Sequence, residues 1–259
     1  MTRYQILRFT GVALLLSHGL AAQSTPYSSL SESARRDKIM LWGSQPDAAA
    51  CQSLQAGLID PSADIRLRAA NALFWKCDRA TTGKTAVKAL CRSVELGNAH
   101  AGAWLLLSYA DAGTAIPCLK KPPRTGAMVK LASSNPVPAG LAARVALARL
   151  GDAGALAALR KTLEKPSLDE ALFLLGALRE IEDSASLAGV IKLLDDNTRQ
   201  APGPDFHSTR PVRNVALQAL VERFHLKPSF AIDPTRKYSD AEVAEVRSAA
   251  TRALSEQRK

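Results

Sequence analysis

Residues 83–85 are Gly-Lys-Thr, the tripeptide that ends the phosphate-binding loop of many nucleotide hydrolases. Such a loop needs another glycine five residues earlier and a buried strand before it, so that backbone N–H groups ring the phosphates. Here Asp78 occupies the place of that glycine, and residues 66–77, RLRAANALFWKC, have a helical pattern. We therefore interpret the stretch as a turn between two helices, in which Thr81 or Thr82 caps the second helix.

Few other side chains have the type and spacing that catalysis requires. His100, His207 and His225 are far apart in sequence and have no motif partners, which favours capping or surface roles. The pair Asp195-Asp196 matches a paired-carboxylate site, but a solvated helix end is favoured. Nucleophile-elbow, zinc-protease and cysteine–histidine signatures are all missing from the sequence. We expect no catalytic residue, no metal ligand and no cofactor, although one pocket gathering these aspartates with His100 and His207 would indicate an enzyme.

Residues 1–22 have the features of an export signal. Arg3 and Arg8 supply positive charge, residues 6–16 are mostly apolar, and small residues up to Ala22 suit cleavage. The apolar run is too short to span a bilayer, which takes roughly 20 residues. An uncleaved anchor or an ordinary N-terminal helix is the alternative. We expect an exported protein, periplasmic or secreted, with no transmembrane segment in the mature chain.

Composition limits both the fold and the partners. Apolar residues make up 47% of the 259 residues and aromatic residues only 5%, so the core must consist mainly of Ala, Leu and Val. Ala and Leu favour helices. The formal charge of +10 falls to +8 when Arg3 and Arg8 leave with the signal. Because these charges alternate with acids rather than forming a stripe, we expect no nucleic-acid partner.

A helical pattern with a regular interruption recurs along the chain. Residues 145–163 predict a helix, a glycine-rich turn and a second helix with leucines on one face. Residues 105–119 and 172–194 follow the same pattern, and the turns contain Asp111, Asp152 and Asp183. If five leucines are equivalent, the repeats are 31 to 42 residues apart; these are Leu73, Leu107, Leu147, Leu178 and Leu220.

Two stretches carry a family resemblance: ARLGDAGALAAL at 148–159 and PVRNVALQAL at 211–220. The chain resembles the HEAT-repeat family over roughly residues 46–225, in the short bacterial form that also occurs in phycobilin-lyase-like proteins. The resemblance implies an all-α fold, a right-handed α-solenoid of about five helical hairpins that offers binding surfaces and no chemistry. The family's arginine at the start of the second helix is missing in three units, which have His100, Gly140 and Ala171 instead.

The repeats suggest a division of the chain into four parts. After the signal peptide at 1–22, residues 23–45 should contain one helix, and residues 46–226 should form the repeat solenoid. Residues 227–259 should add an extended segment and a C-terminal helix, capped by Asp240, that covers the end of the stack.

The mature chain contains an even number of cysteines, Cys51, Cys77, Cys91 and Cys118. Their spacing matches no zinc pattern, and in an exported protein we expect two disulfides. Cys51 and Cys91 would lie on the first helices of neighbouring repeats, which favours the pairs Cys51–Cys91 and Cys77–Cys118. Three pairings are open to four cysteines, and buried free thiols are the alternative to any of them.

Two loops break the repeat. Residues 120–126 are basic, and residues 197–211 are long for a connection between helices and contain three prolines. Either loop could contact a partner, although a tolerated surface insertion is slightly favoured for the longer one. The candidate contact residues are Lys120, Lys121, Arg124, Phe206, His207, Arg210 and Arg213.

These features together predict a binding protein rather than an enzyme. We expect a protein partner, bound at the concave face or at the 197–211 loop. The protein would serve as an adaptor in the cell envelope, or as an inhibitor or immunity protein. A lyase or hydrolase carried by the solenoid is one alternative. A protein that binds an anionic polymer or a membrane surface is another, suggested by the charge.

Overall fold

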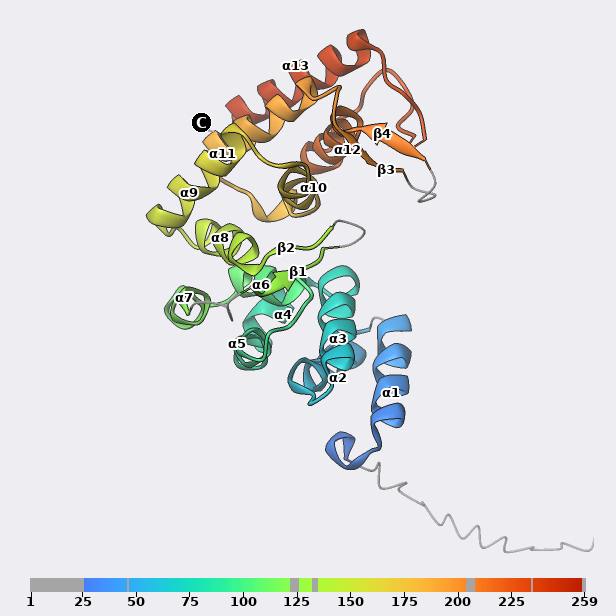
Figure 1. The fold of residues 1–259 in the computed structure, drawn as a ribbon, viewed down its shortest axis with the longest axis vertical. Helices are drawn as coiled ribbons and strands as arrows, with labels where there is room; N and C mark the ends of the chain where they lie inside the picture. The colour runs from blue at the N-terminus through green and yellow to red at the C-terminus, as the bar shows by residue number, and fades with distance from the viewer. Residues whose placement is uncertain are drawn as a thin grey trace, which may run out of the picture.

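Most of the described chain is helical, as the composition predicts. The computed structural model describes residues 26–45, 47–121, 126–131, 135–203, 208–233 and 235–257. Thirteen α-helices lie in these ranges (Figure 1): α1 Glu32–Ser44, α2 Ala48–Leu54, α3 Ala63–Lys76, α4 Arg79–Thr85, α5 Val87–Glu95, α6 Gly102–Leu106, α7 Ala112–Lys120, α8 Ala139–Arg149, α9 Ala153–Glu164, α10 Leu168–Gly176, α11 Ser184–Ile191, α12 Val212–Phe224 and α13 Asp240–Glu256. Short 3₁₀ helices extend several of them: η1 Tyr27–Ser29, η2 Gln55–Ile59, η3 Leu107–Tyr109, η4 Leu178–Glu180 and η5 Lys192–Asp195.

Two small antiparallel hairpins interrupt the helices. Strand β1 (Met128–Val129) pairs with β2 (Val137–Pro138), and β3 (Gln200–Pro202) pairs with β4 (Thr209–Pro211). The second hairpin falls where the sequence predicts a long loop. Strands of two or three residues are too short to give an alternating pattern, so the sequence carries no signal for them.

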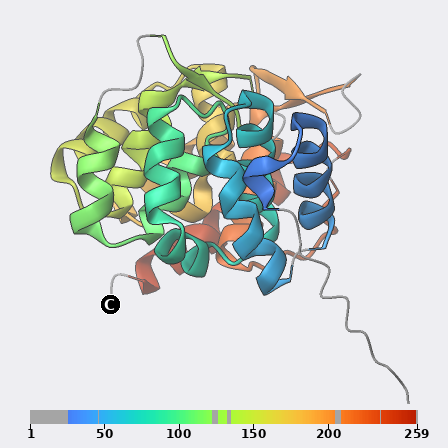
Figure 2. The same ribbon diagram turned by 90° about the horizontal axis from the view of Figure 1, so that it is seen from below.

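Most of the described helices fall into two rows, with α2 and α4 in neither. One row contains α1, α3, α6, α8, α10 and α12; in it α1 packs on α3, α3 on α6, α6 on α8 and α10 on α12. The other row contains η2, α5, α7, α9, α11 and α13, with contacts from η2 to α5, from α5 to α7, from α9 to α11 and from α11 to α13. The chain therefore advances along the long axis from α1 to α13 (Figure 1), and α1 and α3 lie side by side in the view from below (Figure 2, blue and cyan).

A continuous core of small and branched aliphatic side chains joins the two rows. Of the leucines that define the repeat, four are buried and Leu147 is partly buried. Alanines at helix contacts are also buried, which lets neighbouring helices approach closely; they include Ala69, Ala70, Ala142, Ala146 and Ala171. Burying each leucine contributes about 1.5–3 kcal/mol, so the stability of the fold depends on neighbouring helices covering one another.

Aspartates cap five of the helices. Asp111, Asp152 and Asp183, which the sequence places in turns, precede α7, α9 and α11, and each accepts the backbone N–H three residues later at 2.9–3.0 Å. Asp47 and Asp78 do the same for α2 and α4, at 2.7 and 2.8 Å. A carboxylate at this position satisfies an otherwise unpaired N–H and faces the positive end of the helix dipole.

The turn predicted at Gly-Lys-Thr is wrong, because these residues belong to helix α4. The cap is Asp78, not Thr81 or Thr82. Gly83 is buried where α4 crosses η3, and a Cβ built on it would lie 2.5 Å from the Leu106 carbonyl oxygen. The glycine is therefore needed for close packing, and no strand precedes it in the described chain.

The C-terminal helix is present as predicted, and α13 packs on both α11 and α12. Its cap is Ser239 rather than Asp240, one residue earlier than expected. The Ser239 hydroxyl accepts the Glu242 N–H at 3.3 Å, and the Glu242 carboxylate accepts the Ser239 N–H at 2.8 Å. This reciprocal capping box satisfies two backbone donors at once.

All four cysteines form disulfides, but the expected pairing is wrong. The structure joins Cys51 to Cys77 and Cys91 to Cys118, with Cα atoms 5.9 and 5.7 Å apart. Each bond links consecutive parts of the chain, α2 to the end of α3 and α5 to α7, rather than the first helices of neighbouring repeats. The apolar faces were assigned correctly, but a face pattern does not show which neighbour a cysteine meets. Each bond closes a loop of 26 or 27 residues and contributes on the order of 3 kcal/mol.

The pairing can be checked directly, because trypsin cuts between all four cysteines. A non-reducing digest should link the peptide 77–79 to 39–66, and the peptide 89–92 to 93–120. Digestion at mildly acidic pH after thiol blocking prevents exchange, since exchange needs a thiolate. A mass spectrum that links 39–66 to 89–92 would contradict the structure.

The tight contact at Gly83 predicts a clear difference between two glycines. Gly83→Ala should lower the free energy of unfolding by about 1–3 kcal/mol, because the new methyl group meets backbone that cannot move aside. Gly140→Ala, in α8 with open space around the position, should raise it by up to about 1 kcal/mol through helix propensity. Urea denaturation of both variants tests this, and equal shifts would contradict the packing described.

Candidate functional site

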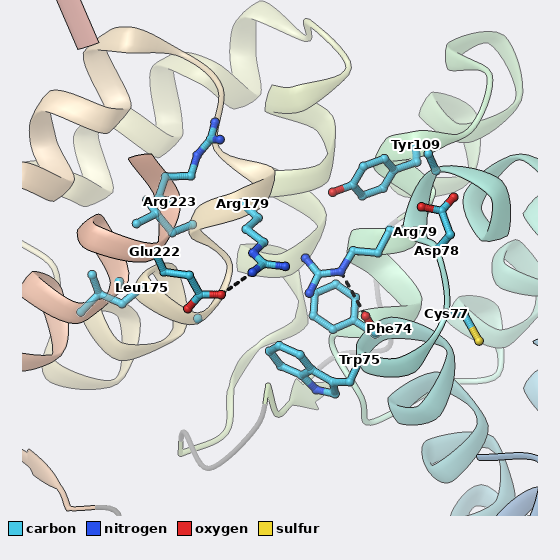
Figure 3. A pocket seen from close by; sticks show the side chains of 14 residues that line it. Phe74, Trp75, Cys77, Asp78, Arg79, Tyr109, Leu175, Arg179, Glu222 and Arg223 are labelled. Atoms are coloured by element: carbon cyan, nitrogen blue, oxygen red, sulfur yellow. Dashed lines mark hydrogen bonds and ion pairs between the residues drawn. The ribbon is translucent and has the colours of Figure 1, made fainter. Parts of the chain in front are cut away.

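A cavity lies between two parts of the chain that are distant in sequence. It has a volume of about 570 Å³. One wall is the end of α3 with the start of α4, and the other is η4 with α12 (Figure 3). Aromatic and cationic side chains dominate the labelled lining, with Trp75 and Tyr109 on one wall and Arg179 and Arg223 on the other.

Two smaller cavities share lining residues with the central one. A cavity of about 200 Å³ beside α1 shares Trp75 with it, and one of about 250 Å³ beside β3 and β4 shares Leu175 and Glu222. We call the three cavities together the inner trough. Trp75 and Met40 line it with 42% and 55% of their surface exposed, so it presents apolar side chains to solvent. Exposed apolar surface beside polar groups is typical of binding sites.

Arg79 projects into the central cavity and is held rigidly. Its Nε donates to the Phe74 carbonyl oxygen at 3.0 Å, and the guanidinium lies over the Phe74 ring, 3.9 Å from the centroid. Nη1 forms an ion pair with Glu180, a residue 101 positions further along the chain. Stacking and paired hydrogen bonds fix the guanidinium plane, which a lysine could not reproduce.

Glu180 lies behind the cavity wall and is fully buried. Its Oε1 accepts the Tyr109 hydroxyl at 3.1 Å, whereas its Oε2 has no hydrogen-bond partner in the described chain. Burial raises the pKa of Glu180, and the neighbouring Arg79 and Tyr109 only partly offset this effect. The carboxylate therefore serves as the counter-ion of Arg79, at the cost of desolvation.

A second arginine, Arg149, stabilises the same wall. The Arg149 guanidinium lies over the Tyr109 ring, 4.1 Å from the centroid, and pairs with Glu182 at 2.8 Å. Its Nη1 also donates to the backbone oxygen of Arg179 at 3.1 Å. These contacts fix the backbone that carries Arg179, while the Arg179 side chain itself extends into the cavity (Figure 3).

The side chains from η4 and α12 are more exposed. Arg179 forms an ion pair with Glu222 at the mouth of the cavity, and both side chains are more than half exposed. Arg223 donates to the Ile181 carbonyl oxygen at 3.3 Å. The cavity thus combines rigid and adjustable cations with aromatic surfaces, an arrangement suited to binding an anionic or aromatic group.

Of the candidate partner contacts that the structure describes, Arg210 lines the inner trough and the others lie outside it. Lys120 pairs with Asp152 and Lys121 with Glu95, at 2.7 and 2.6 Å, and both lysines are exposed. Arg210 donates to Gln218 at 2.6 Å and lines the cavity beside β3 and β4. Arg124, Phe206 and His207 lie outside the described residues.

Arg213 is the candidate contact whose position argues against that role. Its guanidinium is mostly covered and bonds to the Asp240 carboxylate at 2.7 Å and to the Tyr238 carbonyl oxygen at 3.1 Å. The side chain thus ties α12 to the start of α13. Arg66 stands seven residues before Leu73, as Arg213 does before Leu220. It likewise bonds to backbone oxygens, those of Asp60 and Pro61 at 2.7 and 2.8 Å.

The residues that would indicate an enzyme are not brought together, as far as the structure describes them. His100 is buried and its Nδ1 accepts the Gly102 N–H at 3.0 Å, whereas Asp195 pairs with Arg247 and Asp196 with Arg199. His225 ends α12 in the left-handed conformation with φ 51°, which confirms its predicted place at a helix end. The described residues also hold no group of three or more potential metal-ligating side chains.

Sequence reasoning missed the residues of the central cavity. Arg79, Arg179 and Arg223 are spread over much of the chain, and each has the pattern of a charge on a solvated helix face. The adjacent aromatics Phe74-Trp75 are the one local signal, since aromatic residues make up only 5% of the chain. Even that pair, at the end of a helix, is equally typical of a core.

Comparison with known proteins gives no match to any family model, curated protein or solved structure. Among the helices that the structure describes, none has both the length and the apolar character needed to cross a bilayer.

The buried His100 predicts a dependence of stability on pH. Burial lowers its pKa from 6.5 to about 4, and protonating Nδ1 would break the hydrogen bond from Gly102. The unfolded chain binds a proton at higher pH than the folded one. The stability that depends on His100 being neutral is therefore fully present above pH 6.5. It is lost as the pH falls from 6.5 to 4, by on the order of 3 kcal/mol.

The His100→Asn variant isolates this effect, because Asn keeps an acceptor for the Gly102 N–H but does not titrate. Urea denaturation at pH 7 and pH 4 should show that the wild type loses more stability than His100→Asn on acidification. An identical loss in both proteins would show that His100 is protonated equally in the folded and unfolded states.

Proposed function

We propose that this protein is an exported α-solenoid of HEAT-like hairpins that binds another protein along the inner trough. The two alternating rows of helices, the repeat length of 31 to 42 residues and the five aspartate caps support a solenoid. A solenoid offers a long inner surface made from many units, which suits recognition of an extended partner. A right-handed superhelix is the expected form.

The observation that carries the proposal is the composition of the trough. It exposes a tryptophan and a methionine next to arginines and a tyrosine, and these residue types are enriched in protein interfaces. Trp, Tyr and Arg in particular supply most of the binding energy at interface hot spots. The trough also crosses elements from α1 to α12, so it is long enough to accept a chain segment rather than a compact ligand.

Export is supported by the cysteines and by the N-terminal segment. Two disulfides join all four cysteines, and such bonds persist mainly in oxidising compartments. Residues 1–22 have the pattern of a cleavable signal. We therefore place the protein in the periplasm or outside the cell, as an adaptor in an envelope assembly or as an inhibitor of another protein.

A site-specific photo-crosslinker tests this function. With p-benzoylphenylalanine at Met40, inside the trough, irradiation of the producing cells should yield one discrete cross-linked protein. The same group at Lys161, on α9 of the other row, should not give that product. Trp75→Ser, combined with the Met40 crosslinker, should reduce the yield at least several-fold, because it removes the central aromatic contact.

Two results would count against the proposal. A product that forms equally from both positions would indicate non-specific proximity. No product from Met40 or from a second trough position, Leu172, would show that the trough is not a protein-binding surface.

A further inference from the structure

We infer that the centre of the inner trough binds the side-chain carboxylate of an acidic residue in the partner, held between Arg79 and Arg179, with apolar side chains of the same segment on either side. This inference rests on the proposed function and specifies the chemistry of the segment that binds.

Arg79 provides a fixed half of the site. Its Nε is bonded to the Phe74 carbonyl oxygen and its Nη1 to Glu180, while one face of the guanidinium covers the Phe74 ring. Nη2 is then the nitrogen left for a ligand. Because the protein already holds the guanidinium in place, binding a ligand there costs little additional conformational entropy of the Arg79 side chain.

Arg179 provides an adjustable half. Its guanidinium enters the same cavity from the opposite wall (Figure 3), and among the described side chains it forms an ion pair with Glu222 alone, at the surface. Ion pairs between such exposed side chains contribute little. A carboxylate from a partner can therefore replace Glu222, and the fork of Arg179 can bind it through two parallel hydrogen bonds.

The charge of the cavity favours a carboxylate over a phosphate. Three arginines and two acids line the cavity, and Glu180 neutralises Arg79 from behind the wall. With Glu180 counted, three arginines and three acids balance, so the cavity can take one negative charge when the partner's carboxylate displaces the exposed Glu222 from Arg179. A dianionic phosphate would bring twice the charge against Asp78 and Glu180, while Arg223, which forms no ion pair with a carboxylate in the described chain, is bonded to the Ile181 carbonyl oxygen.

The extensions of the trough determine what surrounds the carboxylate. Toward α1 the trough is lined by Met40 and Trp75, and toward the second hairpin by Leu172, Pro202 and Val215. The central cavity therefore has apolar side chains on both sides, next to Arg68 and Lys76 toward α1 and to Arg210 toward the hairpin. An internal Asp or Glu fits this arrangement better than a free C-terminus, which would leave one extension unfilled.

Synthetic peptides test the inference. The probe is an acetylated and amidated peptide, Ala-Leu-Phe-Glu-Leu-Phe-Ala, and its twin has Gln in place of Glu. Titration is followed by the indole N–H signal of Trp75 in an NMR spectrum, assigned with Trp75→Phe among the three tryptophans of the chain. The Glu peptide should bind at least 10-fold more tightly than the Gln twin.

Variants link this preference to the arginines. Arg179→Gln should abolish the difference between the two peptides. Arg92→Gln should preserve it; this control also removes an exposed arginine from a surface ion pair, since Arg92 and Arg179 are 60% and 56% exposed. Because Arg79→Gln alone would leave Glu180 buried without its partner, the Arg79 test uses Arg79→Gln with Glu180→Gln, which should also abolish the difference.

Other outcomes overturn the inference. These are equal binding of the Glu and Gln peptides, no binding of either at millimolar concentration, or tighter binding of a phosphoserine twin. Tighter binding of a Gln peptide with a free C-terminus would identify a terminal carboxylate instead. If the preference for Glu is missing while the Met40 cross-link persists, the proposed function stands and only this inference fails.

Discussion

The constraint that governs this protein is that a short hairpin of alanine- and leucine-rich helices cannot bury both of its apolar faces. Neighbouring helices therefore have to cover these faces, and the described helices share one continuous core. Small residues at the crossings make that stacking close. The closest contact is at Gly83, where helix α4 lies so near η3 that even a Cβ atom does not fit between them.

The Arg79–Glu180 pair connects this stacking to the candidate site. It joins α4 to η4, and its carboxylate lies in the core while its guanidinium reaches the trough. A buried ion pair is costly to desolvate and adds little net stability. Its value here is positional, since it holds an arginine rigidly at the centre of the inner trough, where the other cations are more exposed.

Much of the helical framework could be predicted, because it follows from local interactions. The leucine spacing and the aspartates at 111, 152 and 183 predict helices and their starts within a few residues. The failures share a different cause. The Gly-Lys-Thr stretch is helical because its tertiary contacts outweigh the turn preference of glycine. The cysteines pair between α2 and the end of α3 and between α5 and α7 because of how those helices cross.

The sequence by itself determined that the chain is mostly helical, where aspartates begin several helices, and that its four cysteines could pair. These properties depend on residues within about one or two helical turns of each other. Only the tertiary structure decided which cysteines bond, and that Arg79, Arg179 and Trp75 line one cavity. The relative position of residues a hundred positions apart depends on the packing angles of every helix between them, and no local sequence pattern specifies those angles together.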